Sequence, residues 1–291
     1  MKKTISFTSQ GNNCVGWLFS PSGNGPFPLL IMAHGLAAVK EMRLAAYAEQ
    51  FAQAGYACLV FDYRHFGESE GEPRQLLDIG RQLQDWLAAL EYGRQLPNIN
   101  PNKIVLWGTS FSGGHVLKVA SLTPDVAAVI AQIPHLSGLT AIRMNSMSKV
   151  FLLTMHGLYD LLRAVFGQTP HYIPACAQPH QLAILNGPGE WEGYMRLVPQ
   201  GLAFNHRVAA RFALFVGLYS PIRTLPKLTM PALLQVGRQD RTTPAQPAIA
   251  VSEKFPNLEV KQYATGHFQT YFEPMFTTIV SDQLAFLQES L

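Results

Sequence analysis

Charged residues are scarce in this sequence. Asp, Glu, Lys and Arg make up 14% of the 291 residues, against about a quarter in an average soluble domain, whereas hydrophobic residues make up 48%. The formal net charge is only +3, and no block of Lys or Arg forms a stripe that would follow a phosphate backbone. The composition therefore predicts a globular protein with a large core and argues against a disordered chain or a nucleic-acid-binding protein.

Long apolar runs are also missing. The most apolar segments, such as FALFVGLYSP, are shorter than the roughly 20 residues that span a bilayer. The opening MKKTISFTSQGNN turns polar too soon for the apolar part of a signal peptide. We therefore expect a cytoplasmic protein with no membrane span. The oligomeric state stays open, and a homo-oligomer is one option.

Cysteine is rare and its positions form no pattern. Cys14, Cys58 and Cys176 are an odd number at unrelated spacings, so we interpret them as reduced, structural thiols. The sequence contains no HExxH or CxxC motif, and its histidines share no acidic or cysteine partner at metal-ligand spacing. Neither a metal nor a cofactor is predicted.

What the sequence does contain is an alternation of strand-like and helix-like segments. TISFTSQ and CVGWLFS, separated by Gly11-Asn12-Asn13, predict a leading hairpin. The apolar runs PLLIMA, YACLVFDY, KIVLWG and ALLQVG read as strands, and RQLLDIGRQLQDWLAALEYG reads as a helix between two of them. Near-continuous apolar strands separated by helices predict an α/β fold, whose mostly parallel sheet is flanked by helices.

The alternation breaks between about Pro134 and Pro231. Residues 149–166 predict a helix, and one of its faces carries Phe151, Met155, Leu158, Leu162 and Val165. Residues 202–218 are similarly apolar, so we expect helices to follow one another here without a strand.

This interruption reads as an insertion at the carboxyl edge of the sheet. We expect residues 1–135 and 226–291 to form the core, and residues 136–225 to form a helical cap, or lid, over a site. The alternative is a separate helical domain with no bearing on that site.

Ser110 stands between an apolar strand and a helical segment, in the run GTSFSGG. A serine hydroxyl becomes a good nucleophile only when a base takes its proton, and a sharp strand-to-helix turn projects it toward a substrate. Such a turn crowds its neighbours, so small residues such as Gly108 and Ser112 are needed around it. Ser112 is the weaker candidate nucleophile, because it would lie within the start of the helix.

This run resembles the nucleophile elbow of the α/β-hydrolase family, Gly-x-Ser-x-Gly, with Ser112 in place of the second glycine. The family carries an acid after a later strand and a histidine after the last one. Here Asp240 follows ALLQVG and His267 follows LEVKQYA. The resemblance implies that Ser110 is the nucleophile, that His267 is its base, and that Asp240 orients the imidazole.

A second run, His34-Gly35-Leu36, is similar to the family's His-Gly turn after its third strand. The resemblance implies that the backbone N–H groups of Leu36 and Phe111 form the oxyanion hole. His34 itself is expected to stabilise the turn. In the similar loop FDYRHFGESEG, the expected structural ties are Asp62, Arg64 and Ser69.

Within the family, the chain looks most like the dienelactone-hydrolase and prolyl-peptidase-like branch with an inserted helical cap. Dienelactone hydrolases carry Cys at the nucleophile, where this chain has Ser110. Haloalkane dehalogenases and epoxide hydrolases carry Asp there, so both of these enzyme classes are disfavoured. The resemblance implies a serine hydrolase that cleaves carboxylic esters or thioesters of small molecules through an acyl-enzyme. Cleavage of a carbon–carbon bond or an amide, acyl transfer, and a non-catalytic ligand receptor remain alternatives.

The expected cap is rich in methionine and aromatic residues. Such side chains facing a catalytic serine would make an adaptable pocket for small to medium apolar acyl groups. The candidates for binding substrate are His135, Met144, Phe151, Met155 and Tyr194. The alternative is that the large apolar side chains only pack the cap onto the core.

Overall fold

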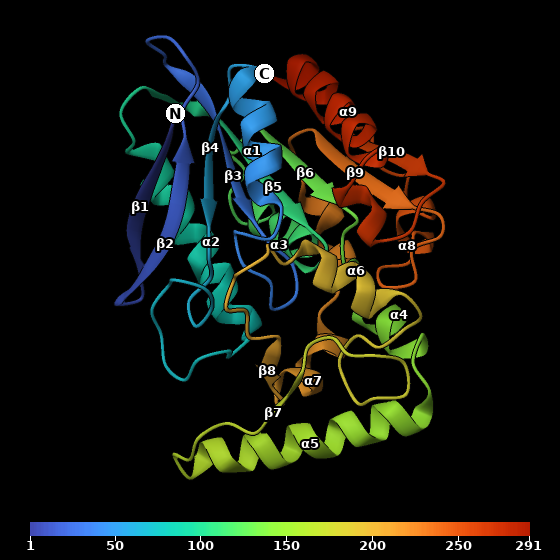
Figure 1. The fold of residues 1–291 in the computed structure, drawn as a ribbon. Helices are drawn as coiled ribbons and strands as arrows, with labels where there is room; N and C mark the ends of the chain where they lie inside the picture. The colour runs from blue at the N-terminus through green and yellow to red at the C-terminus, as the bar shows by residue number, and fades with distance from the viewer.

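A sheet of eight strands forms the centre of the computed structural model, which describes residues 1–291 (Figure 1). The spatial order is β1-β2-β4-β3-β5-β6-β9-β10. β1 and β2 form an antiparallel hairpin, β2 is antiparallel to β4, and the remaining neighbours are parallel. The strands span Lys2–Ser9 (β1), Asn12–Phe19 (β2), Phe27–Ala33 (β3), Ala57–Phe61 (β4), Ile99–Thr109 (β5), Ala128–Gln132 (β6), Ala232–Gly237 (β9) and Leu258–Tyr263 (β10). The predicted fold class is confirmed.

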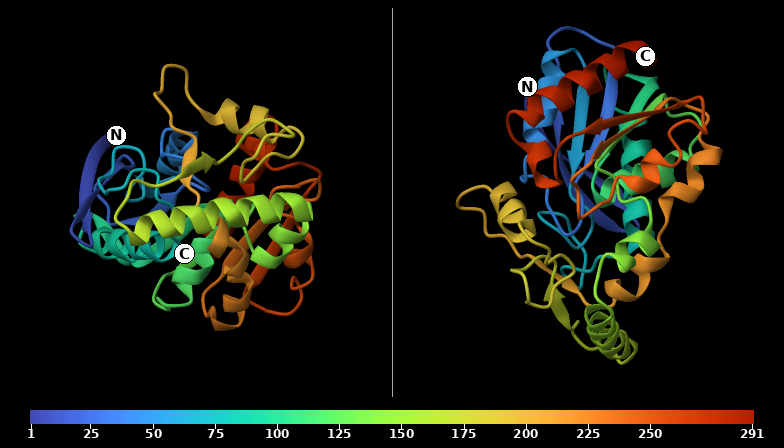
Figure 2. Two further views of the ribbon diagram at one scale, coloured as in Figure 1. Left: turned by 90° about the horizontal axis from the view of Figure 1, so that it is seen from below. Right: turned by 90° about the vertical axis from the view of Figure 1, so that its right-hand side faces the viewer.

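Helices cover both faces of this sheet (Figures 1 and 2). α1 and α9 pack on one face, and α2 and α3 pack on the other. Their bounds, with those of two short turns, are Leu44–Gln53 (α1), Ile79–Arg94 (α2), Phe111–Ala120 (α3), Gln246–Ile249 (α8), Phe268–Tyr271 (η3) and Met275–Ser290 (α9). β3, β4, β6 and β9 are buried on both faces, which explains why their sequences are apolar runs and do not alternate.

α2 begins later than the sequence suggested. Its first residue is Ile79, because the Asp78 side chain accepts a hydrogen bond from the backbone N–H of Arg81 at 2.9 Å and caps the helix. The residues before Asp78 belong to the loop that follows β4.

Residues 136–225, which we call the cap segment, lie beyond the carboxyl ends of the parallel strands (Figure 1). Their elements are Gly138–Arg143 (α4), Met147–Val165 (α5), Tyr172–Pro174 (β7), Glu190–Leu197 (α6), Arg207–Ala209 (β8), Phe212–Phe215 (α7), Val216–Leu218 (η1) and Pro221–Lys227 (η2), the last running into the core. α5 runs along the outer end of the molecule, and both chain termini lie at the opposite end (Figures 1 and 2). None of the helices combines the length and the apolar character that crossing a membrane requires.

The expectation of consecutive helices without a strand is wrong for the cap segment. β7 and β8 pair antiparallel, with Ile173 opposite Val208 and both side chains buried. The stretch 202–218 therefore contains β8, the single turn α7 and η1 in place of one helix. Apolar residues here are buried by strand pairing, which overrides helical periodicity.

Candidate active site

Ser110 occupies the sharp turn between β5 and α3. Its φ of 57° and ψ of −119° place a non-glycine residue in a region that costs of order 1–3 kcal/mol. Two backbone hydrogen bonds hold it there: its N–H donates to the Gln132 carbonyl at 2.9 Å, and its carbonyl accepts from the His135 N–H at 2.8 Å. The turn is therefore fixed by β6 and by the loop that follows it.

Glycines beside the turn permit this close packing. A Cβ at Gly108 would lie 2.3 Å from the Ser112 carbonyl oxygen, and a Cβ at Gly114 would lie 2.4 Å from the His135 carbonyl oxygen. Ser112 is fully buried, and its hydroxyl bonds to the Tyr63 hydroxyl at 2.8 Å. The geometry thus leaves Ser110 as the serine that can face a substrate.

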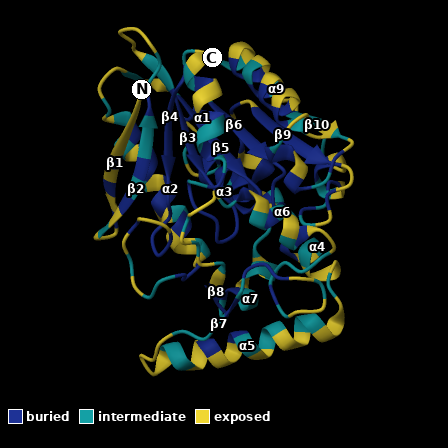
Figure 3. Ribbon diagram, viewed as in Figure 1, coloured by how far each residue is buried: buried dark blue, intermediate teal, exposed yellow.

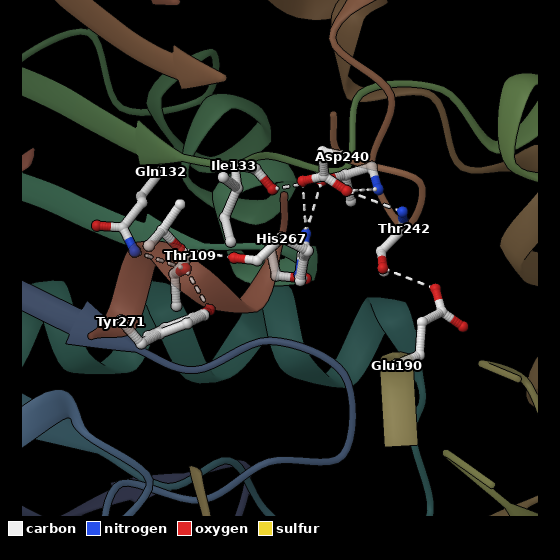
Figure 4. A network of polar contacts seen from close by, with 11 residues as sticks. Thr109, Gln132, Ile133, Glu190, Asp240, Thr242, His267 and Tyr271 are labelled. Carbon is white, nitrogen blue, oxygen red and sulfur yellow. Dashed lines mark hydrogen bonds and ion pairs between the residues drawn. The ribbon is translucent and has the colours of Figure 1, made fainter. Parts of the chain in front are cut away.

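Three side chains from separate loops form one hydrogen-bonded chain. His267 Nε2 lies 3.0 Å from Ser110 Oγ, and His267 Nδ1 lies 2.7 Å from Asp240 Oδ2 (Figure 4). Asp240 follows β9 and His267 follows β10. Because Nδ1 donates its hydrogen to the carboxylate, Nε2 is left as the acceptor for the serine proton. The structure brings together the three residues that the sequence singled out.

The Asp240 carboxylate has hydrogen-bond partners on both oxygens. Oδ1 accepts from the backbone N–H groups of Thr242 and Thr243, each at 2.8 Å. The Thr243 hydroxyl lies 2.9 Å from Oδ2 and 2.9 Å from the Ile133 carbonyl, and donates to one of them (Figure 4). These contacts fix the orientation of the carboxylate. Thr243 was not among the residues predicted from the sequence, although in the run Asp240-Arg241-Thr242-Thr243 the Asp side chain can cap the turn that follows it.

A cap-segment residue also reaches this loop. Glu190, the first residue of α6, accepts a hydrogen bond from the Thr242 hydroxyl at 2.7 Å and another from the Gly187 N–H at 2.6 Å (Figure 4). Glu190 is buried. The loop that carries Asp240 is thereby tied to the cap segment, a link that no local sequence signal indicated.

The two expected oxyanion donors lie beside the nucleophile. Leu36 and Phe111 line the same cavity as Ser110, and Phe111 is the first residue of α3. A Cβ on Gly35 would come within 2.8 Å of Ser110 Cβ, so the His-Gly turn packs directly on the nucleophile. The turn's backbone is thus close enough to the reacting centre for the expected role.

His34 stabilises this turn. Its Nδ1 accepts from the Gly35 N–H at 2.7 Å and its Nε2 donates to the Met42 carbonyl at 2.8 Å. Burial lowers the pKa of His34 to about 4, which keeps the ring neutral. In the loop after β4, Asp62 binds the buried Lys40 and Arg64 binds the buried Asp85, as structural ties would.

A cavity of about 1070 Å³ extends from Ser110 into the cap segment. Half of its lining residues are hydrophobic, and α4, α5, α7 and η1 all contribute to the wall. Within the chain, no three His, Cys, Asp or Glu side chains converge as metal ligands would. The arrangement is a serine, a histidine and an aspartate in one hydrogen-bonded chain, at the end of a large and partly apolar chamber.

The family described as alpha/beta hydrolase fold matches residues 28–274, which is most of the chain. The chain belongs to this family. The match includes Ser110, Asp240 and His267, and it confirms the predicted family.

Relatives of this α/β-hydrolase carry several functional names. It is 41% identical over 285 residues to the quorum-quenching protein AidA of Acinetobacter baumannii (strain MDR-ZJ06), covering 98% of this chain and 93% of AidA. It is 41% identical over 127 residues to thiohydrolase aneE of Aspergillus aculeatus, covering 44% and 39% of the two chains. The crystal structure of α/β-hydrolase GrgF from Penicillium sp. sh18 matches with a TM-score of 0.85 and 25% identity, over 100% and 99% of the chains. The curated Penicillium grgF sequence, named a polyketide transferase, is 32% identical over 174 residues, covering 60% of this chain and 57% of grgF.

The five residues that the sequence suggested as substrate-binding do not all line the large cavity of this α/β-hydrolase. His135 and Met144 line the large cavity. Tyr194 lines a smaller space beside Ser110 and His267, and its hydroxyl donates to the Leu36 carbonyl at 3.0 Å. Tyr194 therefore contacts the turn expected to form the oxyanion hole.

The expectation is not met for Phe151 and Met155. They are 63% and 49% exposed on the outer side of α5, and neither lines the cavity. The reason is that α5 turns inward the side that carries Leu153 and the fully buried Asp160, which forms an ion pair with Arg211 at 2.7 Å. The side with the large apolar residues is consequently left exposed, and Figure 3 shows how much of α5 is exposed.

Lys149 is a cavity residue that sequence reasoning missed. Its Nζ donates to the Ile184 carbonyl at 3.0 Å and to Asn186 Oδ1 at 2.5 Å, and it has no carboxylate within ion-pair distance. Burial lowers the pKa of its ammonium group. A lone lysine in an apolar segment gave no signal of this position.

Proposed function

We propose that this α/β-hydrolase cleaves esters or thioesters of apolar acyl groups through an acyl-enzyme on Ser110. The observation that carries the proposal is the hydrogen-bonded chain from Asp240 through His267 to Ser110, at the inner end of a partly apolar chamber. A hydroxyl bonded to an imidazole, which a carboxylate orients in turn, is the arrangement that activates serine for acyl transfer.

The reaction follows from this geometry. Ser110 Oγ attacks the carbonyl carbon, and its proton passes to His267 Nε2 while Asp240 stabilises the imidazolium. The backbone N–H groups of Leu36 and Phe111 bind the oxygen as it becomes negative, and loss of one such donor typically costs roughly 10²–10³ in turnover. The proton then moves to the departing alcohol or thiol. Water, activated by the same imidazole, releases the acid from Ser110.

The volume of the chamber favours a substrate with a long acyl group. Ligand pockets usually enclose roughly 300–1,000 Å³, and this cavity of about 1070 Å³ is slightly larger than that range. The name of the relative aneE, a thiohydrolase, supports a thioester among the substrates. The name of AidA, a quorum-quenching protein, supports a diffusible small molecule.

Acyl transfer is the second candidate. The relative grgF is named a polyketide transferase, and the cavity is large enough to hold an acceptor beside the acyl group. The two reactions share the acyl-enzyme and differ in whether water or another nucleophile takes the acyl group.

A fluorophosphonate probe and an ester panel test the proposal. We expect the probe to label wild-type protein at Ser110 and to leave Ser110→Ala unlabelled. Values of kcat/KM for p-nitrophenyl acetate, butyrate, hexanoate and dodecanoate should rise with acyl length, by roughly 0.8 kcal/mol per buried methylene until the chamber is full. A steady fall from acetate onward would contradict the apolar site, and absence of labelling would favour a ligand receptor. Trapping the acyl group on an added alcohol or amine distinguishes transfer from hydrolysis.

A further inference from the structure

The helix α5 turns its apolar side away from the protein. Seven large apolar side chains, recurring at three-and-four spacing, are 47% to 74% exposed: Phe151, Leu152, Met155, Leu158, Tyr159, Leu162 and Val165. The opposite side carries the smaller part of the apolar residues, such as Leu153, together with Lys149 in the cavity wall and the fully buried Asp160. A surface helix normally has the reverse arrangement. The outer side of α5 is therefore built for contact with something other than water.

The exposed apolar surface extends beyond α5. Fifteen large apolar side chains between residues 139 and 218 are exposed, the others being Leu139, Ile142, Met144, Met147, Leu161, Phe166, Phe215 and Leu218. At roughly 150–200 Å² for one fully exposed large side chain, they present roughly 1,300–1,700 Å² of apolar surface. The seven on α5 alone present roughly 600–800 Å², whereas the largest apolar patch of a typical monomer covers roughly 300–600 Å². A stable protein interface uses about 800 Å² from each partner.

This surface is continuous with the acyl cavity. Five of its side chains also line the cavity: Leu139, Ile142, Met144, Leu152 and Leu218. They come from α4, the first half of α5 and η1, so the chamber opens between these elements. On this side the wall of the chamber is incomplete within one chain.

The charge pattern indicates what covers the surface. A helix that lies on lipid usually carries Lys and Arg along a polar side that faces water. Here Asp160, the buried charge of α5, faces the protein and is paired with Arg211. The outer side carries a single charged residue, Arg163, whose guanidinium lies over the Tyr159 ring and donates to the Tyr159 hydroxyl at 3.3 Å. The rest of the outer side is rich in methionine and aromatic side chains, the composition found at the centre of protein interfaces. A row of such side chains over 19 residues also suits helix-against-helix packing.

We propose that a second copy of this chain covers the α5 surface in a two-fold symmetric dimer and closes the open side of the acyl cavity. In such a dimer the same surface is used on both copies, and α5 packs against its counterpart. In the closed dimer, both copies contribute to the far wall of each chamber. The inference that the partner closes the chamber rests on the proposed function, whereas the inference of a dimer does not.

Measurement of molecular mass tests the dimer without reference to activity. By light scattering and sedimentation at about 1–100 µM, the wild-type chain should have twice its monomer mass of 32.2 kDa. Leu158→Glu would place two unpaired carboxylates in the interface, so the dimer dissociation constant should rise about 100-fold or more. The matched control is Leu122→Glu, which follows α3 in the core and is 54% exposed against 49% for Leu158. It should stay dimeric, and both variants should keep the circular dichroism spectrum of the wild type.

A wild-type monomer throughout this range, or a Leu158→Glu variant as dimeric as the control, would overturn the dimer. Flotation of a monomeric wild type with anionic vesicles would assign the surface to lipid instead.

A second measurement tests cavity closure. The ratio of kcat/KM for dodecanoate to that for butyrate should fall about fivefold or more in Leu158→Glu, with fluorophosphonate labelling of Ser110 retained. An unchanged ratio in the monomeric variant would refute closure. Absence of ester turnover and labelling in every variant would count against the proposed function and leave the mass result standing.

Discussion

In the core, the strands around the nucleophile bury their apolar side chains almost completely, and the polar groups near Ser110 find partners within the same chain. In the cap segment, α5 buries an ion pair and exposes a row of large apolar side chains. The core is thus a complete unit that holds Ser110, Asp240 and His267 in place. The cap segment shapes an apolar chamber and leaves one side of it open.

The change expected to have the largest effect is Ser110→Ala, in the core. Ser110→Ala should lower ester turnover by about 10⁴-fold or more, because the nucleophilic oxygen is lost. Its unfolding transition should match that of the wild type. Ser112→Ala, the control, removes a hydroxyl that bonds only to Tyr63 and should retain most of the activity. Steady-state kinetics on p-nitrophenyl butyrate measure both variants. If Ser112→Ala lost its activity and Ser110→Ala kept it, the assignment of Ser110 as the nucleophile would be wrong.

Asp240→Asn should have the next largest effect. The amide can no longer stabilise an imidazolium, and it favours the wrong histidine tautomer, so turnover should fall about 10³–10⁴-fold. Ser110 should still react slowly with a fluorophosphonate, which separates this variant from Ser110→Ala. Full activity would point to another acid, and Asp62 would be tested next.

Acid should destabilise the core through three buried histidines. Burial lowers the pKa of His34 and His135 to about 4 and that of His115 to about 3, whereas the unfolded chain binds protons near pH 6.5. The unfolded state therefore binds more protons below that pH, and stability is lost as pH falls from about 6.5 toward 4. At pH 5 one such histidine costs about 2 kcal/mol. Urea unfolding at pH 7 and pH 5 measures the loss, and His115→Gln should flatten it. Equal midpoints at the two pH values would refute this account.

The smallest effect is expected where core and cap segment meet. Glu190→Gln weakens one of two hydrogen bonds, to the Thr242 hydroxyl or the Gly187 N–H, and should reduce kcat by roughly fivefold, about 1 kcal/mol. Glu192→Gln is the control, since it makes the same change of charge in the same turn of α6 at an exposed position. If both variants lost activity equally, the charge of the helix terminus would explain the loss, and the tie to the Asp240 loop would not.

The sequence predicted the core better than the cap segment. Apolar runs located the parallel strands, and the fold brings Ser110, Asp240 and His267 together because all three follow strands that end at the same edge of the sheet. Periodicity also showed which residues share a face of α5. It could not show which face points outward, because that depends on the ion pair between Asp160 and Arg211, 51 residues apart. The roles of Thr243 and Glu190 likewise depend on loops that meet only in three dimensions.

The position of the chain ends has a practical consequence. Both termini lie at the end of the molecule remote from α5 (Figure 1). A tag or surface linker at either end would therefore leave the opening of the chamber unobstructed. Protein immobilised through its termini would present the α5 side to the solution, where a soluble second copy could be captured and counted by a surface biosensor.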